Sequence, residues 1–250
     1  SNSQNTAVGY ASLNVITTGS NNVAMGMNSL RALTSGTENV GIGKDSMYDA
    51  DTASGVVAIG AESAYNITSG SESVAIGKQA LYTATTVGAN TAIGYQALKL
   101  NTAGSNTAVG HSSLLNNSSG TENVAMGYAS GDTVTTGTKN TCIGYNTDVS
   151  DAGAINRTGL GNGITLGANN SVVLGNNDVT AVYMAQDSGA TAHGAGVRMG
   201  GDSTYTNEFK ISAAEVIARF RNDNNNFNGH GILIQCGKDS PASAGDNVYM

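Results

Sequence analysis

The chain has 250 residues, of which 34 are glycine, one is proline, none is tryptophan and only 12% are charged. A net charge of −7, with no Lys/Arg cluster beyond residues 219–221, argues against nucleic acid and anionic lipid as partners. No apolar run is long enough for a transmembrane helix, so we expect no membrane insertion, and Cys142 and Cys236 indicate neither a disulfide framework nor a metal site.

The first 150 residues repeat one phrase nine times. Aligned on a glycine that follows an apolar pair, the phrase recurs with a 17-residue period that is broken by a single shorter interval, from Gly94 to Gly110. The nine aligned glycines are Gly9, Gly26, Gly43, Gly60, Gly77, Gly94, Gly110, Gly127 and Gly144. This period predicts an all-β fold, a parallel β-roll or solenoid of about nine coils that each hold two or three short strands.

Each position of the repeat has its own composition. A large apolar residue precedes the glycine, a small residue such as Ala75 or Ala92 stands two before it, and Val or Thr stands three before it. Neighbouring side chains in a strand point to opposite faces, so the Ala and Gly positions share one face. Because these positions stay small in every copy, we expect close packing there, with sister chains against that face and the Val/Thr and Ile positions in the coil's own core. The glycine also marks a bend, through which a leucine four positions later returns to the core.

An asparagine recurs four positions before the aligned glycine. Stacked identical amides can form a hydrogen-bonded ladder along a solenoid, whereas asparagine is also a favoured turn residue, and both readings stay open. The residues of this predicted Asn ladder are Asn22, Asn39, Asn90, Asn106, Asn123 and Asn140.

The phrases NTAVGYASL (5–13), NVAMGMNSL (22–30), SVAIGKQAL (73–81) and NTAIGYQAL (90–98) resemble the head repeats of trimeric autotransporter adhesins. They are similar, still more closely, to repeats in bacteriophage tail fibres, which share the 17-residue period. The resemblance implies a homotrimer located in a virion tail fibre, with other tail proteins and a host cell-surface glycan or protein as partners. It implies a structural and adhesive role without catalysis or cofactor. The head of a bacterial cell-surface adhesin is the alternative, and a fibre-borne glycan depolymerase is a third.

The repeat decays after residue 150. We expect an irregular β transition or neck over 151–200 and a hairpin-rich segment over 201–250, in which residues 211–220 have an amphipathic helix as the alternative to a strand. The succession resembles tail fibres that end in an endosialidase-type intramolecular chaperone. Because no chaperone domain is present, we expect the chain to be a segment of a longer polypeptide.

Few residues indicate site chemistry, and we expect no catalytic residue and no metal ligand set. Asp187, Ser188 and His193 are interpreted as a polar loop rather than a triad, and Asp148 and Asp151 as turn residues rather than a cation site. The position after the aligned glycine varies and is interpreted as a solvated rim. Its tyrosines are the candidate glycan-contacting residues, because aromatic rings stack on apolar sugar faces: Tyr10, Tyr95, Tyr128 and Tyr145.

Overall fold

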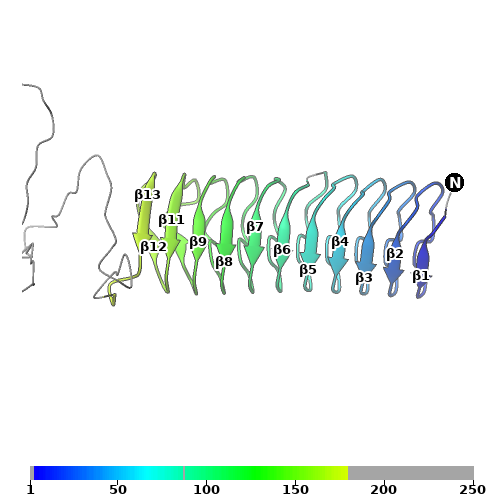
Figure 1. The fold of residues 1–250 in the computed structure, drawn as a ribbon, viewed down its shortest axis with the longest axis horizontal. Helices are drawn as coiled ribbons and strands as arrows, with labels where there is room; N and C mark the ends of the chain where they lie inside the picture. The colour runs from blue at the N-terminus through cyan, green and yellow to red at the C-terminus, as the bar shows by residue number, and fades with distance from the viewer. Residues whose placement is uncertain (1–2, 87, 180–250) are drawn as a thin grey trace, which may run out of the picture. The chain divides into compact units, whose positions relative to one another are not determined.

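The computed structural model describes residues 3–86 and 88–179, which form thirteen strands and no helix. Eleven of the strands make one parallel sheet, in which they lie side by side in chain order (Figure 1). They are β1 (Thr6–Val8), β2 (Val23–Met25), β3 (Val40–Ile42), β4 (Val57–Ile59), β5 (Val74–Ile76), β6 (Thr91–Ile93), β7 (Thr107–Val109), β8 (Val124–Met126), β9 (Thr141–Ile143), β11 (Arg157–Leu160) and β13 (Ser171–Leu174). The other two, β10 (Asp148–Val149) and β12 (Thr165–Leu166), pair in parallel with each other.

The register of the sheet follows the sequence repeat. Between β3 and β4, Val40 pairs with Val57 and Ile42 with Ile59, so each residue faces its own equivalent one repeat later. Each repeat therefore supplies one strand to the sheet and one coil to a solenoid. The predicted all-β parallel solenoid with 17-residue coils is confirmed.

The solenoid is longer than predicted. β11 pairs with β9 in the same register, Thr158 against Thr141, and Gly161 stands one full repeat after Gly144. A shorter coil then brings β13 against β11. The sheet thus continues past residue 150, where we expected an irregular transition, and residues 3–86 and 88–179 form about ten coils, one more than predicted. The tenth coil is inconspicuous in the sequence because Arg157 and Gly159 replace the usual asparagine and alanine.

The interior of the coil is lined by the small middle residues of the strands. Ala75 and Ala92 have no exposed surface, whereas the residues on either side of them in β5 and β6 reach the surface. The prediction that Val/Thr and Ile fill the core while the alanines meet sister chains is therefore wrong. The strand alanines point inward, and the leucines four positions after the bend, such as Leu81 and Leu98, are fully buried with them.

A second interior position, seven positions after the bend glycine, was not recognised in the sequence. It is fully buried but varies in size, as in Leu33, Ala50 and Ile67. In three coils the variation complements the position four after the glycine: Met47 accompanies Ala50, Ala64 accompanies Ile67, and Leu81 accompanies Ala84, whereas the second coil has leucine at both positions, Leu30 and Leu33. Each coil thus keeps a filled but narrow core, as close packing of protein interiors demands.

The aligned glycine forms the bend that ends each strand. Gly60 has φ of +130°, and a Cβ placed on it would lie 2.7 Å from the backbone carbon of Gly77 in the next coil. The close approach at the glycines is therefore between coils of one chain. After the bend, Glu62 (φ 60°) and Ala64 (φ 47°) are also left-handed, a conformation that costs about 1–2 kcal/mol per non-glycine residue. Their N–H groups donate to neighbouring coils, to Lys44 O and Ala80 O, at 2.9 Å each.

Several predictions fall outside the described residues. These are the segment 201–250 with its strand-or-helix alternatives, the part of the transition from residue 180 onward, Cys236, and the loop residues Asp187, Ser188 and His193. Within the described part of the chain, no helix with the length and apolarity needed to cross a membrane occurs.

Candidate functional site

The outward face of the eleven-stranded sheet is apolar and exposed. We define this outward face as the residues that flank the inward middle residue of each strand, such as Val57 and Ile59 in β4. Several of its large side chains are more than a third exposed: Val8 (55%), Met25 (43%), Ile93 (36%), Met126 (42%), Leu160 (41%), Val172 (67%) and Leu174 (47%). The remaining Val, Ile and Thr of strands β2–β9 are mostly half-buried by their neighbours.

The outward face is about as large as the largest apolar patch on a typical monomer, and such patches are often functional. Eleven strands at about 4.8 Å spacing give a strip about 48 Å long, and three-residue strands make it about 10 Å wide, or about 500 Å² in projection. Parallel sheets are normally covered on both faces, and contiguous apolar patches of this size mark interaction sites. The outward face is therefore the strongest candidate for a functional surface among the described residues.

The recurring asparagines form a buried hydrogen-bonded ladder inside the turn that precedes each strand. Asn39 Nδ2 donates to Asn22 Oδ1 at 3.0 Å and to Ala53 O at 2.7 Å, and Asn39 N donates to the same Asn22 oxygen at 3.0 Å. The pattern repeats from Asn123 to Asn106 and from Asn140 to Asn123. At the break, Val56 N still donates to Asn39 Oδ1, and Asn90 N donates to Ser73 Oγ. The asparagines therefore form a ladder between coils and also hydrogen-bond the backbone of the turns.

A buried arginine ends the ladder. Arg157 occupies the asparagine position of the tenth coil, and its N–H donates to Asn140 Oδ1 at 3.1 Å. Its guanidinium, only 4% exposed, donates to Asn169 Oδ1 (2.8 Å), Ser150 Oγ (3.0 Å) and Leu166 O (2.7 Å), and pairs with Asp151 Oδ2 at 2.6 Å. Arg157 therefore neutralises Asp151, which is one of the two aspartates considered above as ligands of a cation.

The second of those carboxylates belongs to a different cluster. Asp148 accepts hydrogen bonds from Thr133 N at 3.0 Å and Val149 N at 2.8 Å, and its carboxyl lies against that of Asp132. Burial first, and then the hydrogen bond with Asp132, raise the pKa of Asp148 to about 6, although the hydrogen bonds from Thr133 and Val149 act to lower it. No group of three or more His, Cys, Asp or Glu suited to a metal ion occurs in the described ranges 3–86 and 88–179.

The tyrosine rim forms an aromatic stack along the solenoid. The rings of Tyr95, His111, Tyr128 and Tyr145 follow one another with centroids 4.8, 5.0 and 5.3 Å apart. Both faces of His111 and Tyr128 are thereby covered by neighbouring rings, so these two rings have no face free for a sugar. Tyr10 stands apart near the N-terminus and is 79% exposed. Sugar stacking on the rim is thus limited to Tyr10 and to the outer faces of the two terminal rings.

A second stack was not anticipated, although its residues recur at a fixed position of the repeat. Tyr48, Tyr65 and Tyr82, each five positions after a bend glycine, stack with centroids 5.0 and 5.1 Å apart. The guanidinium of Arg31, in the preceding coil, lies 5.1 Å from the centre of the Tyr48 ring. The three tyrosines are half-buried and contribute to lateral stiffness rather than to an open site.

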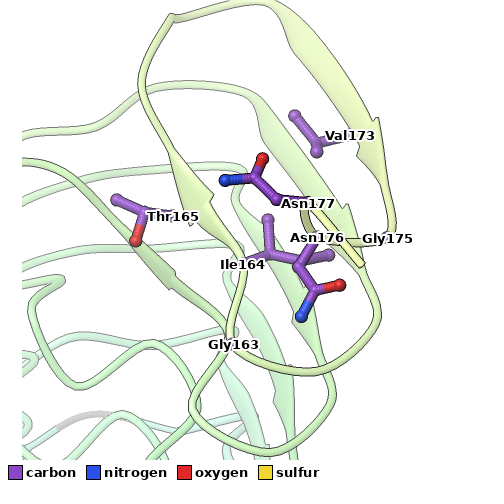
Figure 2. Close-up of a pocket in the computed structure, with 7 residues that line it drawn as sticks. All are labelled: Gly163, Ile164, Thr165, Val173, Gly175, Asn176 and Asn177. Atoms are coloured by element: carbon purple, nitrogen blue, oxygen red, sulfur yellow. The ribbon is translucent and has the colours of Figure 1, made fainter. Parts of the chain in front are cut away.

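A shallow pocket of about 240 Å³ lies in the last described coil, beside β12 and β13 (Figure 2). Ile164 and Val173 supply apolar walls, and Asn176 and Asn177 contribute amides. Its lining holds no charged or nucleophilic side chain apart from the hydroxyl of Thr165, so it offers no catalytic constellation. Three glutamates each stand five positions before a bend glycine, and they are all exposed and lie in different coils, so they do not form a carboxylate pair within one coil: Glu38, Glu72 and Glu122.

No family model, curated protein or solved structure matches this chain. Its function is therefore inferred from the solenoid, from the surfaces described above and from the repeat phrases.

Proposed function

We propose that the chain is a structural and adhesive segment of a bacteriophage tail fibre that assembles as a homotrimer and projects a host-binding region. The repeat phrases support this proposal by their resemblance to tail-fibre repeats. The solenoid supports it physically. Hydrogen bonds join each strand to the next along the sheet, and the Asn ladder adds bonds between coils except where Val56 and Ser73 interrupt it, so the folded chain resists bending and offers few unpaired segments to proteases.

The outward face of the sheet is the observation that carries the proposal. Each of its eleven strands presents a large apolar side chain outward, with threonine at the other outward position of five strands, and a parallel sheet with one such face in water would be exceptional. Further copies of the same chain are the natural cover, because identical solenoids laid side by side match each other in length and spacing. Three copies around a common axis can shelter all three faces in a single core, and closed cyclic symmetry leaves no face uncovered.

The proposed mechanism of attachment is mechanical and multivalent. A trimer presents every surface position three times at fixed spacing, so contacts with a host glycan or protein that are individually weak gain through effective concentration. Other tail proteins would hold the trimer at one end. No step of this mechanism requires a bond to be broken, and we assign the described chain no catalytic role.

The mass of the native particle tests the assembly. A trimer has three times the single-chain mass of 25.1 kDa. We expect Ile76→Asp, which places a charge in the middle of the outward face, to give particles of single-chain mass with the β-rich spectrum retained. Ser69→Asp, at an exposed turn away from that face, is the matched control and should leave the trimer mass unchanged. A parent particle of single-chain mass would contradict the proposal.

Binding to cells tests the adhesive role. We expect the fluorescently labelled trimer to adsorb to a subset of strains in a panel of bacteria, and unlabelled trimer to compete for the same cells. Ile76→Asp should bind far more weakly because it has lost multivalency. Equal binding by single chains and trimers would show that adhesion does not depend on the proposed arrangement.

A further inference from the structure

The outward face of the sheet has two margins that differ in chemistry. The turn margin is the residue five before each bend glycine, and the bend margin is the residue directly after that glycine. From the first coil to the ninth, the turn margin reads Gln4, Asn21, Glu38, Gly55, Glu72, Ala89, Ser105, Glu122 and Lys139. In the same order, the bend margin reads Tyr10, Met27, Lys44, Ala61, Lys78, Tyr95, His111, Tyr128 and Tyr145.

The two lysines of the bend margin are matched by glutamates at the turn margin of the same coils, whereas Glu122 and Lys139 at the turn margin lie in coils with Tyr128 and Tyr145 at the bend margin. Only two coils carry a lysine at the bend margin, the third with Lys44 and the fifth with Lys78, and each has a glutamate at its turn margin, Glu38 and Glu72. In the fourth coil, between them, both margins are neutral, Gly55 and Ala61. All four charged side chains are exposed.

These charges do not satisfy one another within the chain. Six residues of extended backbone place the two margins of one coil up to about 20 Å apart. Among the described residues, Lys44 has an ion pair only with its neighbour Asp45, at 3.3 Å, and Glu38, Glu72 and Lys78 have none. The complementary charges thus lie on opposite sides of the apolar strip, where only another molecule can bring them together.

The apolar strip is also too small to form a standard interface unaided. Its projected area of about 500 Å² is shared between two partners in a trimer, whereas a standard interface buries about 800 Å² on each side. The margins must therefore take part in the contact. When three flat sheets enclose a three-fold axis parallel to the solenoid, each corner joins the bend margin of one chain to the turn margin of the next.

We propose that the bend margin of each copy packs against the turn margin of the next copy at the same height, and that Glu38–Lys44 and Glu72–Lys78 pairs between chains fix the axial register. The inference rests on the proposed trimer and assigns its contacts and alignment. An offset of one coil opposes Lys44 and Lys78 with uncharged residues at the turn margin. An offset of two coils forms a single lysine–glutamate contact, either Lys44 with Glu72 or Lys78 with Glu38. In-register packing forms both pairs and is the alignment that closes into a ring about this axis, so the charges disfavour open, staggered assemblies.

The same arrangement gives the aromatic stack a role. Tyr95 and His111 belong to coils whose turn margins hold the small residues Ala89 and Ser105, which leave room for rings from the adjacent copy. Because the rings already cover each other's faces, they present edges and polar groups outward. Amphipathic aromatic edges of this kind are enriched in interfaces between proteins. The stack is thus part of the contact between copies rather than a row of open sugar platforms.

Disulfide trapping tests the register directly. In a Cys236→Ser background, E38C/K44C is expected to give a covalent trimer under mild oxidation, because each chain is bonded to both neighbours around the ring. E38C or K44C alone should give none, and E38C/K78C, whose cysteines lie two coils apart, should give no covalent trimer. A native trimer in which E38C/K44C fails to crosslink, or E38C/K78C crosslinks equally well, would overturn this inference while leaving the proposed function intact. A single-chain native mass would overturn both.

Charge reversal provides an independent measurement. K44E/K78E opposes like charges in two coils, and we expect the trimer to dissociate at protein concentrations at least tenfold above those at which the parent dissociates, most strongly at low salt. E38K/K44E/E72K/K78E exchanges the two margins and should restore parental assembly. If the fourfold variant assembles no better than K44E/K78E, the margins do not face each other as proposed.

Discussion

Asn39 Nδ2 donates to Asn22 Oδ1 at 3.0 Å, from one coil to the next and within a site that has no exposed surface. The same acceptor receives the backbone N–H of Asn39, so one side-chain amide joins both the backbone and the side chain of the next coil. Every buried side-chain nitrogen and oxygen in the described residues has a partner. The ladder therefore gives a narrow solenoid, with little apolar area per coil, a second source of cohesion.

Removing one amide from the ladder should be costly. Asn123→Ala leaves Gly137 O without its donor and Asn140 N and Nδ2 without their acceptor, so we expect the free energy of unfolding to fall by about 2–4 kcal/mol. Urea unfolding followed by circular dichroism measures the loss. Asn116→Ala removes an exposed amide that also bonds a neighbouring coil, to Asp132 O, and should cost less than about 1 kcal/mol. Equal losses for the two variants would mean that burial of the ladder is unimportant.

The bend glycine tolerates no side chain. In Gly60→Ala, the new Cβ would lie 2.7 Å from Gly77 C and 2.8 Å from Gly77 O, at a φ of +130°. Because backbone of the next coil cannot yield locally, we expect destabilisation of at least about 3 kcal/mol, measured as a fall in unfolding midpoint. Gly163→Ala is the control, since its φ of +62° suits an alanine poorly but its Cβ would meet nothing within 4 Å. We expect it to cost about 1 kcal/mol.

The sequence carried most of the fold because the repeat constrains it many times over. The 17-residue period predicts coils, and the coils predict a parallel sheet in which equivalent residues pair, as Val40 does with Val57. The repeat also continues beyond residue 150: Gly161 keeps the 17-residue period after Gly144 and indicates the tenth coil. The tyrosine stacks are likewise visible as one residue type recurring at one position.

Which face points inward could not be deduced from alternation alone. The alternation of side chains along a strand shows that Ala75 points to the face opposite that of Val74 and Ile76. It does not show which of the two faces is exposed to solvent. The usual assumption that larger apolar residues fill the core fails here, because a 17-residue coil encloses too little space for them beside the leucines. The second interior position was hard to recognise for a related reason. A large residue at one of the two positions accompanies a small one at the other, as in Met47 with Ala50 and Ala64 with Ile67, so neither position is uniformly large in the aligned repeats.

The reversal of the faces changes the expected effect of enlarging an alanine. Ala75→Leu adds volume inside a filled coil, so we expect the folded chain itself to lose about 1–3 kcal/mol, or more if the coil opens, whether or not it is assembled. Ile76→Leu, on the outward face of the same strand, should cost much less because the side chain can adjust at the surface. Thermal unfolding of the two variants as single chains makes the comparison, in an Ile42→Asp background that places a charge on the outward face two coils before Ile76 to prevent assembly. An unchanged melting temperature for Ala75→Leu would contradict an inward alanine.

Cys142 should be chemically inert in the folded chain. It replaces an inward strand alanine and is almost fully buried, and this burial, with a smaller contribution from the charge of Asp148, raises its pKa to about 12. A thiol with so little thiolate at neutral pH reacts slowly with electrophiles. In a Cys236→Ser background, we expect no labelling by a maleimide or an aromatic disulfide at neutral pH until urea unfolds the protein. Labelling at a rate typical of a free thiol would mean that the ninth coil opens readily.

The carboxyl of Asp148 should make stability depend on pH in a direction opposite to that of a salt-bridged aspartate. Its pKa is raised from 3.8 to about 6, so the folded chain binds this proton more tightly than the unfolded chain does. The stabilisation is therefore complete below about pH 4 and is lost as the pH rises through 6. The shift alone corresponds to at most about 3 kcal/mol, which solvent screening at this half-buried site reduces to about 1 kcal/mol.

Asp148→Asn stays neutral, so its free energy of unfolding should exceed that of the parent by this amount at pH 7, and the excess should vanish near pH 3. Unfolding titrations of both proteins from pH 3 to 8 measure the difference. A constant difference across that range would show that the proton shared between Asp148 and Asp132 does not contribute to stability.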